Sequence, residues 1–114
     1  MDIKVIKSLQ DIFNSISNIE LFMESRPREF ATFCNDVCFC SAVKWEIAII
    51  GEAMNRILKI DPEIGITSAK RIVATRNYVI HGYDSLKKDI LWSIVINHLP
   101  LLKREVQFLL DSQE

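Results

Sequence analysis

The sequence predicts an all-α protein, a bundle of about five helices running up and down within one domain that covers residues 1–114. Apolar residues recur at intervals of three and four along most of the chain, which is the spacing of amphipathic helices. No segment between these stretches shows the alternation typical of a strand, which leaves a helical bundle. The chain is 49% hydrophobic, enough for one core, and its three Gly and three Pro give no sign of a linker.

The first predicted helix runs from Val5 to Met23, where the apolar residues form one stripe along the helix. The segment Arg26-Pro27-Arg28 ends it, because proline lacks an amide proton and forces the preceding residue out of helical geometry. A short helix is expected next, from Arg28 to Asp36.

A long helix is predicted from about Val37 to Ile60. It carries two adjoining apolar faces, which predict a central position in the bundle. Gly51 lies beside its narrow polar side, where a missing side chain would let another backbone come close. The dipeptide Asp61-Pro62 ends the helix. The apolar residues are Val43, Ile47, Ile50, Met54 and Ile57 on one face, and Ala42, Trp45, Ile49 and Ala53 on the other.

A fourth helix is expected to begin near Ala69, with Thr67 or Ser68 as its cap, and to run towards Gly82, a residue that tolerates the left-handed geometry after a helix. The last helical region runs from about residue 86 to 95, is interrupted near Pro100 and resumes over residues 101–110.

Composition and cysteine spacing exclude several classes of protein. A net charge of −1 argues against a surface coated with basic residues, so any phosphate-binding site must be local. Cys34, Cys38 and Cys40 cannot all pair within the chain and lack the spacing of zinc sites, so we expect a cytoplasmic, reduced protein without metal or cofactor. No apolar stretch approaches the ~20 residues that span a bilayer, and no signal-peptide core is present, so export and membrane insertion are not expected.

Arg76 falls in the middle of the apolar stripe of the fourth predicted helix. A charge in an apolar setting is costly unless it is paired, so Arg76 should meet a carboxylate, a helix end or an anionic ligand. A purely structural ion pair would satisfy the same requirement.

His81 follows five residues later, about 140° around the helix at ~100° per residue, so one straight helix does not aim both side chains at one point. Asn77 lies on the face of His81 and is well placed to hydrogen-bond the imidazole. Arginine with a histidine that titrates near neutrality suits RNA cleavage without metal, since imidazole can move a proton while guanidinium stabilises charge on phosphorus. A solvent-facing histidine at a helix end is the plainer interpretation.

Basic residues gather around these positions. Between Thr67 and Lys88 there are five basic residues against one acidic residue, Asp84, which gives a local charge of +4. Such a patch favours a polyanionic substrate. The alternative is that these charged residues simply form a helix face that contacts solvent. Tyr83, two residues after His81, could pack over the helix end or stand beside the imidazole. The basic residues of the patch are Lys70, Arg71, Arg76, Lys87 and Lys88.

The segment RNYVIHGY, from Arg76 to Tyr83, resembles the RxxxxHxY motif of HEPN proteins. The segment WEIAIIGEAMNRI, from Trp45 to Ile57, is similar to the long helix of that family, and DILWSIVINHLPLLKREV resembles its closing segment. These three blocks, in this order and at this length, are hard to obtain by chance. They indicate a HEPN-type bundle of the HepT branch, the ribonuclease toxins of HEPN/MNT toxin–antitoxin pairs.

This resemblance implies a homodimer that brings the Arg76 and His81 helices of two subunits into one cleft and cuts RNA without metal. It also implies an MNT-type minimal nucleotidyltransferase as partner, which adenylylates the motif tyrosine, here Tyr83. An AMP group on Tyr83 would hinder the binding of RNA through its bulk and its negative charge. Glu52 matches a family position, and we expect it to pair with basic residues near the cleft; a merely solvated glutamate is the alternative. The preceding loop, EIGITSAKRI, departs from the family by lacking a tryptophan.

Two other functions fit the same sequence. HEPN domains also act as non-catalytic RNA- or nucleotide-binding accessory subunits of a minimal nucleotidyltransferase, in which case the motif would bind phosphate without cleaving a bond. A purely structural dimerisation bundle is the third possibility, and it would make Arg76 and His81 replaceable with little effect beyond stability. The intact Arg, His and Tyr favour the regulated toxin.

Overall fold

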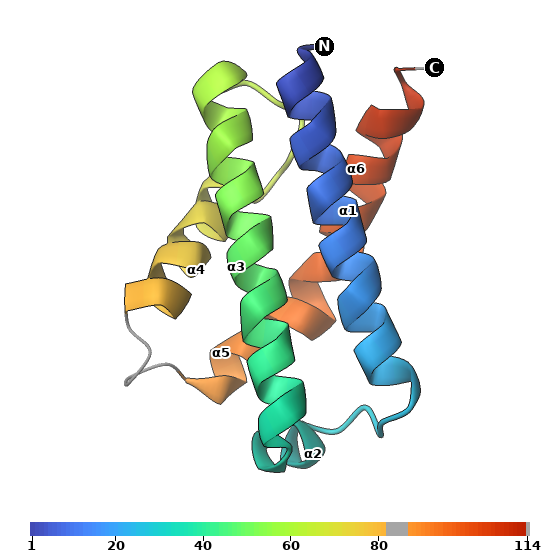
Figure 1. The fold of residues 1–114 in the computed structure, drawn as a ribbon, viewed down its shortest axis with the longest axis vertical. Helices are drawn as coiled ribbons and strands as arrows, with labels where there is room; N and C mark the ends of the chain where they lie inside the picture. Colours follow the sequence, from blue (N-terminus) through green and yellow to red (C-terminus); the bar gives the residue numbers. More distant parts are fainter. Residues whose placement is uncertain (82–86, 114) are drawn as a thin grey trace.

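The computed structural model describes residues 1–81 and 87–113, with the backbone alone for residues 78–81. The helices are α1 (Ile3–Glu24), α2 (Phe30–Asn35), α3 (Val37–Ile60), α4 (Ala69–His81), α5 (Lys88–Ser93), the π-helical turn η1 (Ile94–His98) and α6 (Leu99–Asp111). The described residues contain no strand, so the predicted all-α class is confirmed. Successive long helices run in opposite directions, as Figure 1 shows.

Helix α3 is the centre of the bundle, as its two apolar faces predicted. It packs along α1 and α4 and also meets α2 and α5, while α6 covers the far side of α1. Local signals fix its ends: the Asp36 carboxylate accepts a hydrogen bond from the Phe39 amide at 2.9 Å, and Pro62 comes two residues after its last residue, Ile60. The α1 stripe of Val5, Leu9, Ile12, Ile16 and Ile19 is buried against α3.

One sequence expectation about α3 is only partly met. Ala53 on the second apolar face is buried, and Ala42 and Ile49 are half-buried, but Trp45 keeps 69% of its surface exposed. This tryptophan is therefore mostly exposed although it lies on an apolar face of the helix.

The closing helix does not break at Pro100. Helices α5, η1 and α6 follow one another without a gap, and the Leu99 amide donates to the carbonyl of Ile94, five residues earlier. Proline has no amide proton and its ring crowds the carbonyl four residues before it, so a wider π-helical turn lets the chain continue helical through this point. The predicted interruption is therefore a change of helix type.

The loop before α4 is tied to the last helix. The Thr67 amide and hydroxyl both donate to the carboxylate of Glu105 on α6, with the hydroxyl bond at 2.7 Å. Thr67 thus anchors the loop, and its hydroxyl is not used as the cap considered for α4. Gly82, the residue expected to follow the helix, lies outside the described residues.

Candidate active site

Helices α3 and α4 come close together where Gly51 meets Arg76. A Cβ built on Gly51 would stand 2.0 Å from the Cβ of Arg76 and 3.1 Å from its Cα. No real side chain tolerates such a contact, so any larger residue here would force the helices apart. The absence of a side chain at Gly51 therefore sets the position of the Arg76 backbone against α3.

Arg76 meets a carboxylate, one of the three kinds of partner that its place on an apolar stripe predicted. Its Nη2 lies 2.7 Å from Oε2 of Glu52 on α3, the residue next to Gly51. Its Nη1 donates at 2.7 Å to Oδ1 of Asn77. The Nε is buried and has no hydrogen-bond partner among the described residues, while the whole side chain keeps 26% of its surface exposed. The guanidinium is thus held at two nitrogens, on a side chain that is partly exposed.

The structure brings three of the predicted site residues together: Arg76, Asn77 and Glu52. The side-chain oxygen of Asn77 accepts a hydrogen bond from Arg76, and the predicted hydrogen bond between Asn77 and the imidazole of His81 stays a prediction. His81 is the last residue of α4, and its side chain is not described. Tyr83 lies outside the described residues. The catalytic and modification roles of these residues remain predictions.

The residues of the predicted basic patch lie on α4 and at the start of α5. Lys70 and Arg71 are exposed in the first turn of α4, more than one turn before Arg76. Lys88 donates from its Nζ at 2.8 Å to the carbonyl of Cys34, so it fastens the start of α5 to α2. Lys87 is exposed beside it. The patch is therefore spread along α4 and the start of α5, and at least one of its lysines has a structural contact.

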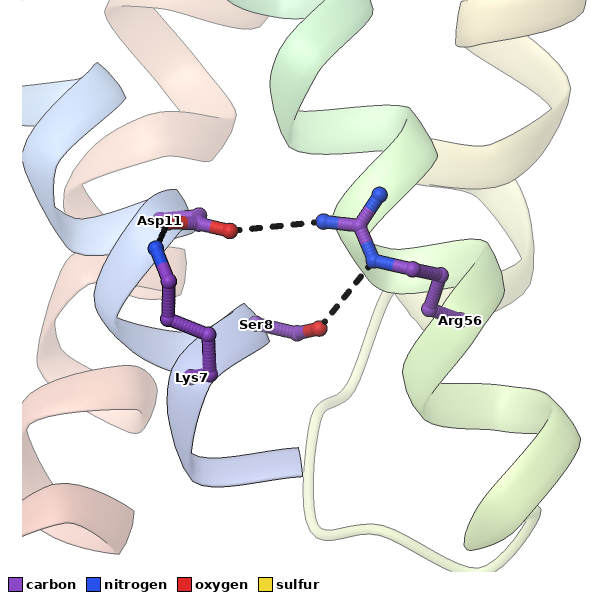
Figure 2. Close-up of polar contacts among 4 residues, drawn as sticks. All are labelled: Lys7, Ser8, Asp11 and Arg56. Atoms are coloured by element: carbon purple, nitrogen blue, oxygen red, sulfur yellow. Dashed lines mark hydrogen bonds and ion pairs between the residues drawn. The ribbon is translucent and has the colours of Figure 1, made fainter. Parts of the chain in front are cut away.

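A second arginine, Arg56, lies one turn beyond Glu52 on α3. Figure 2 shows it reaching across to α1, where its Nε donates to the hydroxyl of buried Ser8 at 3.3 Å and its Nη2 lies 3.4 Å from Oδ2 of Asp11. The sequence pattern did not single out this cluster. The sequence signal that could have indicated it is the opposite charge of Lys7 and Asp11, four residues apart on one helix. These two residues form an ion pair in the structure.

The three cysteines are free: Cys34 is half-buried, Cys38 exposed and Cys40 buried. Among the described residues, no group of three His, Cys, Asp or Glu side chains is arranged to hold a metal ion. None of the described helices is both long enough and apolar enough to cross a bilayer.

Comparisons with known proteins point in one direction. A family profile described as "Ribonuclease HepT-like" matches residues 6–109. A curated protein of Methanocaldococcus jannaschii, named "Putative RNase MJ1380", is 31% identical over 101 residues, which cover 87% of this chain and 90% of that protein. No solved structure matches the chain significantly.

Proposed function

This chain belongs to the HepT-like ribonuclease family, and from that membership we propose that it is an endoribonuclease that cuts RNA without a metal ion. Arg76 and His81 are its catalytic pair. The observation that carries the proposal is the fixed guanidinium of Arg76, set against α3 by Gly51 and held by Glu52 and Asn77 beside the helix end that bears His81.

The reaction needs two proton movements and one charge to be stabilised. The ribose 2′-oxygen attacks phosphorus and loses its proton to a base, the bond from phosphorus to the 5′-oxygen breaks, and that oxygen takes up a proton. Imidazole can perform either proton transfer near neutral pH, which is the role of His81. Arg76 stabilises the negative charge on the phosphoryl oxygens. No step needs a redox partner or a nucleotide.

The active site is composite across a homodimer. About 140° of helix rotation separates Arg76 from His81, so the pair from one α4 does not converge on one phosphate. Two copies of α4 facing each other across a two-fold axis supply the missing groups to one cleft. Lys70, Arg71, Lys87 and Lys88 then contribute attraction for the RNA backbone along the cleft.

The ribonuclease is the toxin of a toxin–antitoxin pair in the cytoplasm. An MNT-type minimal nucleotidyltransferase holds it inactive by transferring AMP to the hydroxyl of Tyr83, with pyrophosphate as the leaving group. The added phosphate and adenosine next to His81 repel and obstruct RNA. This regulation rests on the resemblance of RNYVIHGY to the family motif.

The second candidate is a non-catalytic RNA- or nucleotide-binding accessory subunit. The Arg76 guanidinium is held by Glu52 and Asn77, and the side chain keeps 26% of its surface exposed. An arginine held in this way is also suited to bind a phosphate and leave the bond intact.

The experiment that tests the proposal is cleavage of a labelled RNA in the presence of a chelator. Wild type, Arg76→Ala, His81→Ala and the control Arg104→Ala, an exposed arginine on α6, are compared, with the mass of each in solution measured alongside. We expect cleavage by wild type and Arg104→Ala and at least a roughly hundredfold loss in the other two. Undiminished cleavage by His81→Ala would contradict the proposed mechanism. RNA binding without cleavage by wild type would favour the accessory subunit.

A further inference from the structure

Trp45 is the largest side chain that the described structure leaves uncovered on α3, with 69% of its surface exposed. Tryptophan buries a large area when it finds a partner and is the residue type most enriched at the energetic centres of protein interfaces. Ile3, Val37 and Phe108 are also highly exposed, but they lie in the first turns of α1 and α3 and in α6. Trp45 alone among them shares a helix face with the candidate active site.

The spacing along α3 relates Trp45 to the Arg76 ion pair. Glu52 follows Trp45 by seven residues, so the two side chains leave the helix within about 20° of one another and about 10.5 Å apart along its axis. Ala48 and Ile49 lie between them, both half-buried and neither long nor charged. This stretch of α3 therefore offers a tryptophan at one end, an ion pair at the other and a small apolar centre.

We propose that a second copy of the chain covers this stretch, so that Trp45 of each subunit packs against the Glu52–Arg76 ion pair of the other. A two-fold axis between Ala48 and Ile49 exchanges residue 45 with residue 52, which is the self-complementary arrangement that an isologous dimer requires. The inference rests on the composite dimer proposed above and adds to it a residue that each subunit lends to its partner's site.

The chemistry of Arg76 suits an aromatic partner. Its Nη1 and Nη2 already have acceptors in Asn77 and Glu52, and its side chain remains 26% exposed, so a ring can add contacts without displacing either acceptor. Arginine stacks well on tryptophan, and the attraction grows when water is excluded. Covering the pair also strengthens the attraction between Glu52 and Arg76, because the local dielectric falls. Trp45 is thus a positioning residue that acts through Arg76.

Disulfide trapping tests the contact directly. With Cys34, Cys38 and Cys40 replaced, cysteines are placed by Trp45→Cys and Glu52→Cys in the same chain. Two turns of helix hold these positions about 10.5 Å apart in one subunit, beyond the roughly 7 Å limit for a disulfide. A bond can form only between subunits. The matched control is Asn14→Cys with Leu21→Cys, two exposed positions with the same spacing on α1.

At a protein concentration high enough to offset the loss of the Trp45 ring, we expect mild oxidation to convert the 45/52 variant to a covalent dimer and to leave the 14/21 variant uncoupled. Fluorescence provides a second readout without altering the contact: in Trp92→Phe, emission from Trp45 should shift to shorter wavelength as rising concentration drives dimerisation. Trp45→Ala should weaken the dimer about tenfold or more, and Phe108→Ala should not.

The outcomes separate this inference from the proposed function. In one outcome, wild type is dimeric and cleaves RNA, but no 45/52 dimer is trapped and the Trp45 emission does not shift. This outcome would overturn the inference and would not affect the proposed ribonuclease activity. A monomeric wild type would overturn both the inference and the composite active site.

Discussion

Gly51 on α3 packs directly against Arg76 on α4, so that a Cβ added to Gly51 would lie only 2.0 Å from the Cβ of Arg76. The neighbour of Gly51, Glu52, then lies at the right height to bind the Arg76 guanidinium. The helix contact and the ion pair are therefore one arrangement, because the register that seats Arg76 over Gly51 also brings Nη2 to the carboxylate.

We predict that Gly51→Ala disrupts this arrangement. The added methyl group overlaps backbone-proximal atoms of Arg76 that cannot rotate away, so α4 must move outward, at a cost of about 1–3 kcal/mol in the free energy of unfolding. Alanine favours a helix more than glycine does and will offset part of this cost. RNA cleavage should fall further than stability, because Arg76 moves with α4. Thermal unfolding and cleavage assays measure the two effects.

Gly65→Ala is the control for that substitution. A Cβ at Gly65 would meet no described atom within 4 Å, and its φ is not positive, so the change should leave the melting temperature and cleavage nearly unaltered. Equal losses in both variants, or a Gly51→Ala protein as active and as stable as wild type, would show that the contact does not hold Arg76 in place.

The sequence was sufficient to predict most helices, because their ends are signalled locally. Helix α3 begins and ends where predicted, at Val37 and Ile60, since Asp36 can cap it and Asp61-Pro62 cannot continue it. Pro100 was misinterpreted as a break, because the relief that η1 provides depends on packing around the turn rather than on the proline itself. Trp45 was placed on an apolar face for a similar reason: periodicity reports residue type and cannot report whether a neighbour is present.

The sequence predicted that Arg76 needs a partner, but it did not predict which residue that partner is. The charge of Arg76 on an apolar stripe required a partner, but a carboxylate, a helix end and a ligand all met that requirement. The choice of Glu52 follows from how far α4 slides along α3, and Gly51 sets that register although it lies far from Arg76 in the sequence. Asn77 illustrates the same limit, since the sequence did not predict that its side-chain oxygen accepts a hydrogen bond from the neighbouring Arg76.

We predict that Glu52→Gln lowers cleavage without unfolding the protein. The substituted amide would keep the shape of the side chain and one hydrogen-bond acceptor but lose the charge that orients Arg76. The Glu52 side chain is 43% exposed, so solvent screening limits the loss of stability to at most about 1 kcal/mol. Cleavage should fall severalfold, mainly in kcat, and less than in Arg76→Ala. Glu24→Gln, at an exposed position in the last turn of α1, is the control. If Glu52→Gln cleaves RNA as fast as wild type, Glu52 does not position Arg76.

The Arg56 cluster predicts a different outcome for a neighbouring arginine. Arg56→Ala removes one long bond to Ser8 and one exposed ion pair to Asp11 (Figure 2), and such surface pairs contribute between 0 and about 1 kcal/mol. We expect a small loss of stability that shrinks as salt is raised, because screening already weakens the pair. Cleavage should stay within about twofold of wild type. A loss as large as that in Arg76→Ala would instead place Arg56 among the residues that bind RNA.

Asp36 gives the bundle a predictable response to acid. The hydrogen bond from the Phe39 amide, followed by that from Arg26, lowers the pKa of the Asp36 carboxyl below its usual value of 3.8. A group with a lowered pKa in the folded state stabilises the fold above its unfolded pKa, and this contribution disappears as pH falls through the folded pKa. The stabilisation is therefore complete at neutral pH and is lost below about pH 4.

Asp36→Asn isolates that charge, because asparagine also caps helices well and keeps an acceptor for the Phe39 amide. The variant should melt below wild type at pH 7, since it lacks the charge that faces Arg26 at 3.0 Å. The two melting curves should converge as the pH is lowered below about 4, where wild type becomes protonated as well. A gap that is constant from neutral pH down to strongly acidic pH would mean that the charge of Asp36 contributes nothing, and that the substitution acts through the shape of the cap alone.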